Sequence, residues 1–138
     1  MSEINIYFEQ IAPFDLPKEF LKGKITEMIK EEKKERGEIC IIFCSDEYLI
    51  EINRKYLNHD YYTDIVTFNY VERNVISGDL FISTERVKEN ALKYGVDFMS
   101  ELYRVIFHGI LHLCGYDDST DKEKEIIRNK ENYYLNII

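Results

Sequence analysis

Two histidines and an aspartate near the C-terminal end of the chain have the types and spacing of metal ligands. His108 and His112 lie four residues apart in an apolar segment of helical character. Their imidazoles therefore project from one helix face, roughly one turn of 5.4 Å apart. Two imidazoles at this separation can both reach one ion at about 2.0–2.1 Å. Gly115 follows, and a helix that ends at a left-handed glycine lets the chain reverse toward the same face.

Asp118, in the stretch after this glycine, supplies an oxygen donor that zinc accepts. We predict a metal site formed by His108, His112 and Asp118, with zinc as the expected ion and another divalent transition metal as the alternative. Three protein ligands leave one position open for water, as a catalytic site requires. The alternative is that both histidines are packed or surface residues. The chain has only 3 histidines, and two of them precede a glycine turn and paired aspartates, so the metal site is the better interpretation.

The residue after the first histidine bears on the type of hydrolysis. Metallopeptidases that use H-x3-H ligands place a glutamate there as the general base. This chain has Gly109 at that position. A peptidase would lack its usual proton acceptor, so peptide hydrolysis is the weakest of the hydrolytic alternatives.

Hydrophobic periodicity and turn residues predict the elements that must position these side chains. We expect strands over residues 4–8, 38–44, 64–70 and 79–83, with a turn within residues 74–78. We expect helices over residues 18–36, 45–57, 84–94, 100–114 and 120–136. This pattern predicts a single α+β domain over residues 1–138, with about four strands in a mixed sheet packed with four or five helices. The metal site would lie at a helix end and in the turn that follows it.

Composition limits the partners and the compartment. The chain has 138 residues and a formal net charge of −8, which opposes nonspecific binding to a phosphate backbone. Any contact with nucleic acid must therefore rely on a local basic surface or on a metal ion. The 3 cysteines resemble small buried residues more than a disulfide framework, which favours a reducing compartment. No apolar run approaches the ~20 residues of a membrane span, and no secretory signal is visible. We expect a cytoplasmic protein.

The stretch HGILHLCGYDD, residues 108–118, resembles the signature H-G-x-L-H-L-x-G-Y-D-H of the YbeY family, which are metal-dependent bacterial endoribonucleases of ribosomal RNA maturation. Three further stretches resemble motifs of this family in the same order: NRKY at 53–56, TDIVTF at 63–68 and GDLFIS at 78–83. The resemblance covers most of the chain from Glu38 onward.

The resemblance implies an endoribonuclease that acts on ribosomal RNA, most readily single-stranded, with RNA and a ribosomal subunit as partners and neither DNA nor a membrane. A bound ion would lower the pKa of its water toward ~7 and polarise the scissile phosphate. Activated water or the RNA 2′-hydroxyl would attack phosphorus, and the sequence leaves this choice open. The alternatives are a metal-stabilised RNA- or ribosome-binding factor with little catalysis, and a hydrolase of another ester or amide.

Two positions depart from the family pattern. Asp118 stands where the family usually has histidine, which keeps zinc plausible and makes a harder metal such as manganese more acceptable. Leu57 stands where the family usually has an arginine associated with activity. Arg54, Lys55 and Arg73 are candidates for phosphate contact, although each also fits an ordinary surface residue.

The general base is left unassigned by the sequence. Asp117 is either a base, a partner for a histidine N–H group, or the cap of the last helix. Asp64 either lines the cleft or simply begins a strand.

Overall fold

The computed structural model describes residues 3–60 and 62–137, and within these ranges four strands form one sheet. The strands are β1 (Ile4–Glu9), β2 (Glu35–Cys44), β3 (Ile65–Asn69) and β4 (Val75–Ser83). The helices are α1 (Lys18–Glu31), α2 (Asp46–Tyr56), α3 (Thr84–Tyr94), α4 (Phe98–Leu113) and α5 (Asp121–Asn136). This confirms the predicted α+β class with a four-stranded mixed sheet and five helices.

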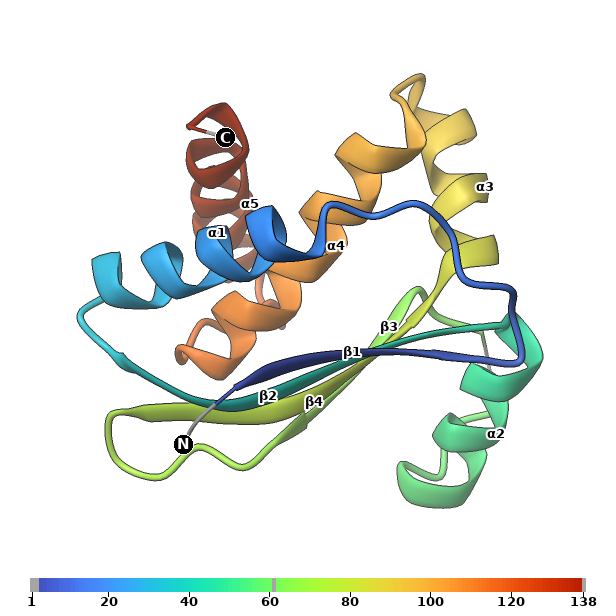
Figure 1. Ribbon diagram of the computed structural model, residues 1–138, viewed down its shortest axis with the longest axis horizontal. Helices are drawn as coiled ribbons and strands as arrows, with labels where there is room; N and C mark the ends of the chain where they lie inside the picture. The colour runs from blue at the N-terminus through green and yellow to red at the C-terminus, as the bar shows by residue number, and fades with distance from the viewer. Residues whose placement is uncertain (1–2, 61, 138) are drawn as a thin grey trace.

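The sheet has the order β1-β2-β4-β3, with β1, β2 and β4 parallel and β3 antiparallel at one edge. Helices α1, α3, α4 and α5 lie on one side of the sheet, and α2 lies on the other (Figure 1). Side chains alternate between the two faces along each strand. On β2, for example, Ile39, Ile41 and Phe43 are fully buried beneath the helical layer.

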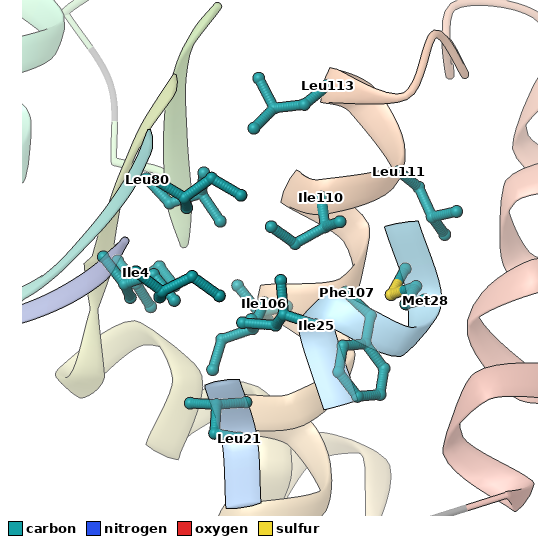
Figure 2. Close-up of a cluster of buried hydrophobic side chains, with 14 of the residues drawn as sticks. Ile4, Leu21, Ile25, Met28, Leu80, Ile106, Phe107, Ile110, Leu111 and Leu113 are labelled. Carbon is teal, nitrogen blue, oxygen red and sulfur yellow. The ribbon is translucent and has the colours of Figure 1, made fainter. Parts of the chain in front are cut away.

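Helix α4 is the centre of the core between the sheet and the other helices. In Figure 2, Ile106 and Ile110 of α4 point toward the sheet, where Leu80 of β4 lies, and Phe107 lies near Met28 of α1. Most of α4 is buried, but Arg104, His108 and His112 are only half-buried. Their spacing of four residues places them on one stripe of the helix. The helix therefore uses most of its surface for packing and one narrow stripe for the functional site.

Local capping explains where several helices begin and end. The side chains of Ser45 and Ser83 accept hydrogen bonds from first-turn N–H groups of α2 and α3, and Gly95 ends α3 in the left-handed conformation, as predicted. Thr120 and Glu123 form a reciprocal capping box at the start of α5.

Three predicted boundaries were wrong: the end of α1, the start of β2 and the start of β4. Helix α1 ends at Glu31 rather than near residue 36, because Lys33 has φ 63° and the chain from Glu35 pairs with β4. Pairing within the sheet outweighs the helical propensity of the lysines and glutamates here. Helix α4 begins at Phe98, close to the start predicted at or near residue 100, because the side chain of Asp97 caps it.

A turn was predicted within residues 74–78, and Asn74 does lie in a turn, but β4 already begins at Val75 and runs through Gly78. A Cβ atom at residue 78 would lie 2.8 Å from the side chain of Leu113 and 2.5 Å from the carbonyl oxygen of Phe68. Gly78 thus allows a strand to approach α4 closely and does not mark a turn. None of the helices in the described ranges combines the length and apolar character needed to span a membrane.

Candidate metal centre

The two histidines of α4 and the aspartate that follows this helix meet at one point, as their spacing predicted. Nε2 of His108 lies 3.0 Å from Nε2 of His112 and 3.2 Å from Oδ2 of Asp118. Nε2 of His112 lies 3.5 Å from the same carboxylate oxygen. One donor atom from each of the three residues therefore faces a common position.

The turn after α4 explains how Asp118 reaches the histidines. The N–H of Gly115 donates to the carbonyl of His112 and the N–H of Tyr116 donates to the carbonyl of Leu111, both at 3.0 Å. These two bonds form a Schellman motif, and Gly115 has the positive φ, 110°, that this motif places on glycine. The chain reverses there and returns along the face that carries both histidines.

The donor set fits a divalent metal. Ligands at about 2.0–2.1 Å from a tetrahedral zinc ion are separated from one another by about 3.3–3.4 Å. The three separations of 3.0, 3.2 and 3.5 Å bracket this value. Two imidazole nitrogens and one carboxylate oxygen are also donors of the kinds that zinc accepts. His108, His112 and Asp118, here called the triad, could therefore hold one ion.

Glu131 of α5 is a functional residue that the sequence analysis missed. Its Oε2 accepts a hydrogen bond of 2.6 Å from Nδ1 of His108, and its Oε1 accepts one of 3.0 Å from Nη1 of Arg104. A carboxylate on the second ring nitrogen orients the imidazole and leaves Nε2 for a metal. The sequence did contain an indication of this contact, because Glu131 is a charged residue on the same helix face as the buried Ile127 and Tyr134.

The surroundings of His108 favour its protonated form when no cation is bound. Burial lowers the pKa of His108, but the hydrogen bond and charge of Glu131, with the charges of Asp118 and Asp64, raise it above its ordinary value of 6.5. The same carboxylates that attract a proton here would attract a divalent cation.

Asp64 lies immediately before β3 and lines the cleft beside His108. Its side chain faces the amide of Asn90, with Nδ2 to Oδ2 at 3.5 Å. Burial raises the pKa of Asp64, and the charge of His108 partly opposes this rise. Both roles considered for Asp64 therefore apply, since it borders the cleft and directly precedes the strand.

Gly109 is required by packing. A Cβ atom at residue 109 would lie 2.7 Å from Leu80 and 2.8 Å from Ile65, both side chains of the sheet. The glutamate of a metallopeptidase would have no room here unless α4 moved away from the sheet. The structure thus gives a steric reason for the absence of a peptidase base.

The cleft beside the triad has two lobes. The first, of about 460 Å³, lies between the end of α2, β3 and the turn after α4, and Leu57, His59, Thr67 and Asp117 contribute to it. The second, of about 490 Å³, lies between α3, α4 and α5, and Asn90, Tyr94, Lys124 and Arg128 contribute to it. Asp64, Ile65, His108 and Asp118 line both lobes, so the triad lies where they meet.

The basic residues singled out from the sequence line neither lobe. Arg54 pairs with Glu51 at 2.8 Å and with Asp60 at 2.5 Å. Lys55 lies over the ring of Tyr56. Arg73 lies in the turn between β3 and β4, with φ 55°. Leu57 does line the first lobe, so the departure from the family pattern falls within the cleft.

Asp117 lines the first lobe and does not cap the last helix, because Thr120 occupies that position. The prediction that Asp117 caps α5 was therefore wrong. The carboxylate partner of His108 is Glu131. A role for Asp117 as a base stays a prediction.

Fold and site together define a class: a small α+β protein with a potential metal centre at the end of its central helix. A family model for endoribonuclease YbeY matches residues 7–138. Proteins named endoribonuclease YbeY are similar over nearly the whole chain: that of Parabacteroides distasonis is 48% identical, with 98% of this chain and 95% of the relative covered. The corresponding protein of Phocaeicola vulgatus is 50% identical, with 98% of both chains covered.

The chain therefore belongs to the endoribonuclease YbeY family, a family of RNA-cleaving hydrolases. This confirms the family resemblance seen in residues 108–118. The fold agrees as well: the solution structure of TM1509 from Thermotoga maritima superimposes with a TM-score of 0.69 and is 31% identical, with 94% of this chain and 86% of that chain covered.

Proposed function

We propose that the protein is a metal-dependent endoribonuclease of ribosomal RNA and that His108, His112 and Asp118 hold its metal ion. The observation that carries this proposal is the convergence of three donor atoms, separated by 3.0–3.5 Å, where two lobes of a cleft meet. Membership of a family of RNA-cleaving hydrolases supplies the substrate class. Zinc is the proposed ion because it accepts this mixed set of nitrogen and oxygen donors.

A divalent ion at the triad would supply positive charge that polarises a scissile phosphate and lowers the pKa of nearby water toward ~7. The protein's own residues orient the site and handle protons. Glu131 holds the ring of His108 in place. In the first lobe, Asp64 and Asp117 are the lining carboxylates outside the triad that can accept a proton from the attacking group. Separate Asp64→Asn and Asp117→Asn variants identify the base, since its loss should flatten the acidic limb of the pH–rate profile, along which activity rises as the base loses its proton.

The direct test pairs metal content with RNA cleavage. Purified protein should contain about one equivalent of a divalent transition metal, and it should cleave single-stranded RNA in a manner that a chelator abolishes. His112→Ala should lose both the metal and the cleavage, whereas Lys30→Ala, an exposed residue outside the cleft, should retain both. Full cleavage by a metal-free His112→Ala protein would refute the mechanism.

The identity of the ion is tested at the position that departs from the family pattern. Asp118→His replaces an oxygen donor by nitrogen, which suits zinc better than it suits manganese. The ratio of zinc to manganese affinity should therefore rise in this variant. An unchanged ratio would indicate that Asp118 is not a ligand.

A second function is a metal-stabilised RNA- or ribosome-binding factor with little catalysis. The observation that favours it is the first lobe, where Leu57 lies and where no lysine or arginine is among the lining residues. In that case a chelator would lower the melting temperature, because an ion that binds the native state stabilises it. No RNA turnover would exist for the chelator to remove.

Ribosomal RNA as the substrate, a ribosomal subunit as the partner and the cytoplasm as the compartment are part of the same proposal. All three cysteines are free, and Cys44 and Cys114 are buried, which fits a reducing compartment. Cleavage of precursor ribosomal RNA should exceed cleavage of an unrelated RNA of equal length.

A further inference from the structure

The two lobes of the cleft differ in their positive charge. Among the residues that the structure describes, no lysine or arginine lines the first lobe, whereas Arg104, Lys124 and Arg128 line the second. Both lobes share His108 and Asp118. An RNA strand cut at the triad must therefore extend from there into one lobe or both, and among the described lining residues the lysines and arginines that attract its phosphates belong to the second lobe.

Two of these three cations are available for a ligand. Arg104 is occupied, because its guanidinium donates to Glu131 at 3.0 Å and to Asn132 at 2.9 Å. The Arg128 side chain is 66% exposed, and its nearest carboxylate oxygen, on Glu131, is 3.7 Å from Nε, beyond hydrogen-bond range. Lys124 is exposed, and its ammonium has no ion pair with the residues that the structure describes. The two residues are four apart on α5, so their side chains leave the same face of the helix.

The carboxylates of the second lobe do not cancel this charge at its rim. Glu101 and Glu131 are buried, and Glu131 already binds His108 and Arg104. Asp118 faces the two histidines, and Asp64, which also lines this lobe, is half-buried and faces Asn90. The acidic groups therefore lie toward the protein interior or the triad, whereas Lys124 and Arg128 are exposed to solvent.

An aromatic ring also lines this lobe. Tyr94 is the last residue of α3 and is 61% exposed, and the ammonium of Lys93 lies 5.6 Å from its ring centroid. Its hydroxyl has no hydrogen bond with the described part of the chain. Exposed tyrosine rings beside basic residues are the surfaces on which single-stranded nucleic acids stack their bases.

We infer that the second lobe is a subsite for single-stranded RNA on one side of the cleaved bond, where Lys124 and Arg128 bind phosphates and Tyr94 stacks on a base. This inference rests on the proposed function and extends it. It supplies the local basic surface that a chain of net charge −8 needs for RNA. It also places the phosphate-binding charge on α5, in a protein whose first lobe has Leu57 and no cation.

The charge is tested with the double variant Lys124→Ala/Arg128→Ala in the metal-loaded protein. Cleavage of a fluorescent single-stranded RNA should show a KM raised about tenfold and a kcat within about twofold of wild type, since phosphate contacts away from the reacting atoms affect binding uniformly. The slope of log affinity against log salt, measured by anisotropy with a cleavage-resistant single-stranded RNA analogue, should become shallower by about 1.4, or 0.7 for each lost phosphate contact. Wild-type values of both KM and the salt slope would overturn the inference.

Lys30→Ala/Lys33→Ala is the matched control. It removes the same charge from exposed positions at the end of α1 and after it, which line neither lobe. Its KM and salt slope should equal those of wild type. If KM rose and the salt slope became shallower by the same amounts in this control, net charge, rather than the second lobe, would drive binding.

Stacking is tested with Tyr94→Ala and Tyr94→Phe. Alanine should lower RNA affinity about tenfold or more, while phenylalanine should retain it, because stacking needs the ring and not the hydroxyl. If Tyr94→Ala and Tyr94→Phe lost RNA affinity equally, the result would contradict stacking.

Failure of the subsite can be told apart from failure of the proposed function. If wild-type protein cleaves RNA but the second-lobe variants match it, the subsite is wrong and the function stands. If wild-type protein neither binds nor cleaves RNA, both are overturned.

Discussion

Nδ1 of His108 lies 2.6 Å from Oε2 of Glu131, a bond that joins the central helix α4 to the C-terminal helix α5 at the candidate metal centre. Glu131 is only 3% exposed, and its other oxygen accepts from Arg104. The orientation of the His108 ring is thus set by a residue 23 positions away in the sequence. With Nδ1 engaged, Nε2 is the atom that faces His112 and Asp118.

Replacing this carboxylate should weaken metal binding without removing a ligand. Glu131→Gln keeps the shape of the side chain but loses its charge, and we expect metal affinity to fall about 10- to 100-fold. Competition with a chromophoric chelator measures this change. Asn132→Ala is the control, because Asn132 contacts Arg104 and not the histidine. Wild-type affinity in Glu131→Gln would show that the bond does not tune the site.

Gly109→Ala should destabilise the protein although alanine is the better helix former. The new methyl group would lie 2.7–2.8 Å from Leu80 and Ile65, and overpacking of this kind costs about 1–3 kcal/mol. Gly23→Ala in α1 has open space around the added atom, so it should raise the free energy of unfolding by up to about 1 kcal/mol. Urea denaturation of both variants measures whether each substitution raises or lowers the free energy of unfolding. A stabilising Gly109→Ala would contradict the packing argument.

Gly115→Ala should affect both stability and metal affinity. A residue with a Cβ atom at φ 110° is strained, at a cost of about 1–3 kcal/mol, and relief of that strain would shift Asp118. Gly95→Ala, at φ 68°, is the matched control, because it should lower stability but leave metal affinity unchanged. Calorimetric titration with zinc separates the two variants. Equal metal affinities would mean that the turn does not position Asp118.

Glu32 ties the end of α1 to the segment that carries the triad. It accepts hydrogen bonds from Tyr116 at 2.6 Å, from Lys130 at 3.1 Å, and from Tyr134. Burial raises the pKa of Glu32, but these three partners together bring it below its ordinary value of 4.5. A carboxyl group with a lowered folded-state pKa stabilises the protein above the unfolded value, and this stabilisation is lost as pH falls through the folded value.

The stability difference between wild type and Glu32→Gln should therefore depend on pH. We expect about 2 kcal/mol at pH ~7, from hydrogen bonds to a charged group, and a difference that shrinks as the medium is acidified below pH ~4.5. Urea unfolding across this range measures it. Glu27→Gln, an exposed position on α1, should show a small difference at every pH. If the stability difference between wild type and Glu32→Gln grew in acid, the pKa of Glu32 would be raised in the folded state and not lowered.

The sequence by itself determined the parts of this protein that depend on neighbours along the chain. The spacing of His108 and His112 encodes one helix face, and Gly115 encodes the reversal that returns Asp118 to it. The four strands and five helices followed from periodicity and capping in the same way, and the family from residues 108–118. These features can be predicted from the sequence because side-chain direction and backbone conformation depend on residues that are close along the chain.

Tertiary structure decided what depends on residues that are far apart in sequence. The start of β2 at Glu35 required the partner strand β4, and the role of Gly109 required Leu80 and Ile65 of the sheet. Glu131 reached His108, and the charge of the cleft gathered in the lobe that α5 borders, only because α5 packs beside α4. Such contacts depend on how helices and strands pack in three dimensions, and local periodicity does not encode that arrangement.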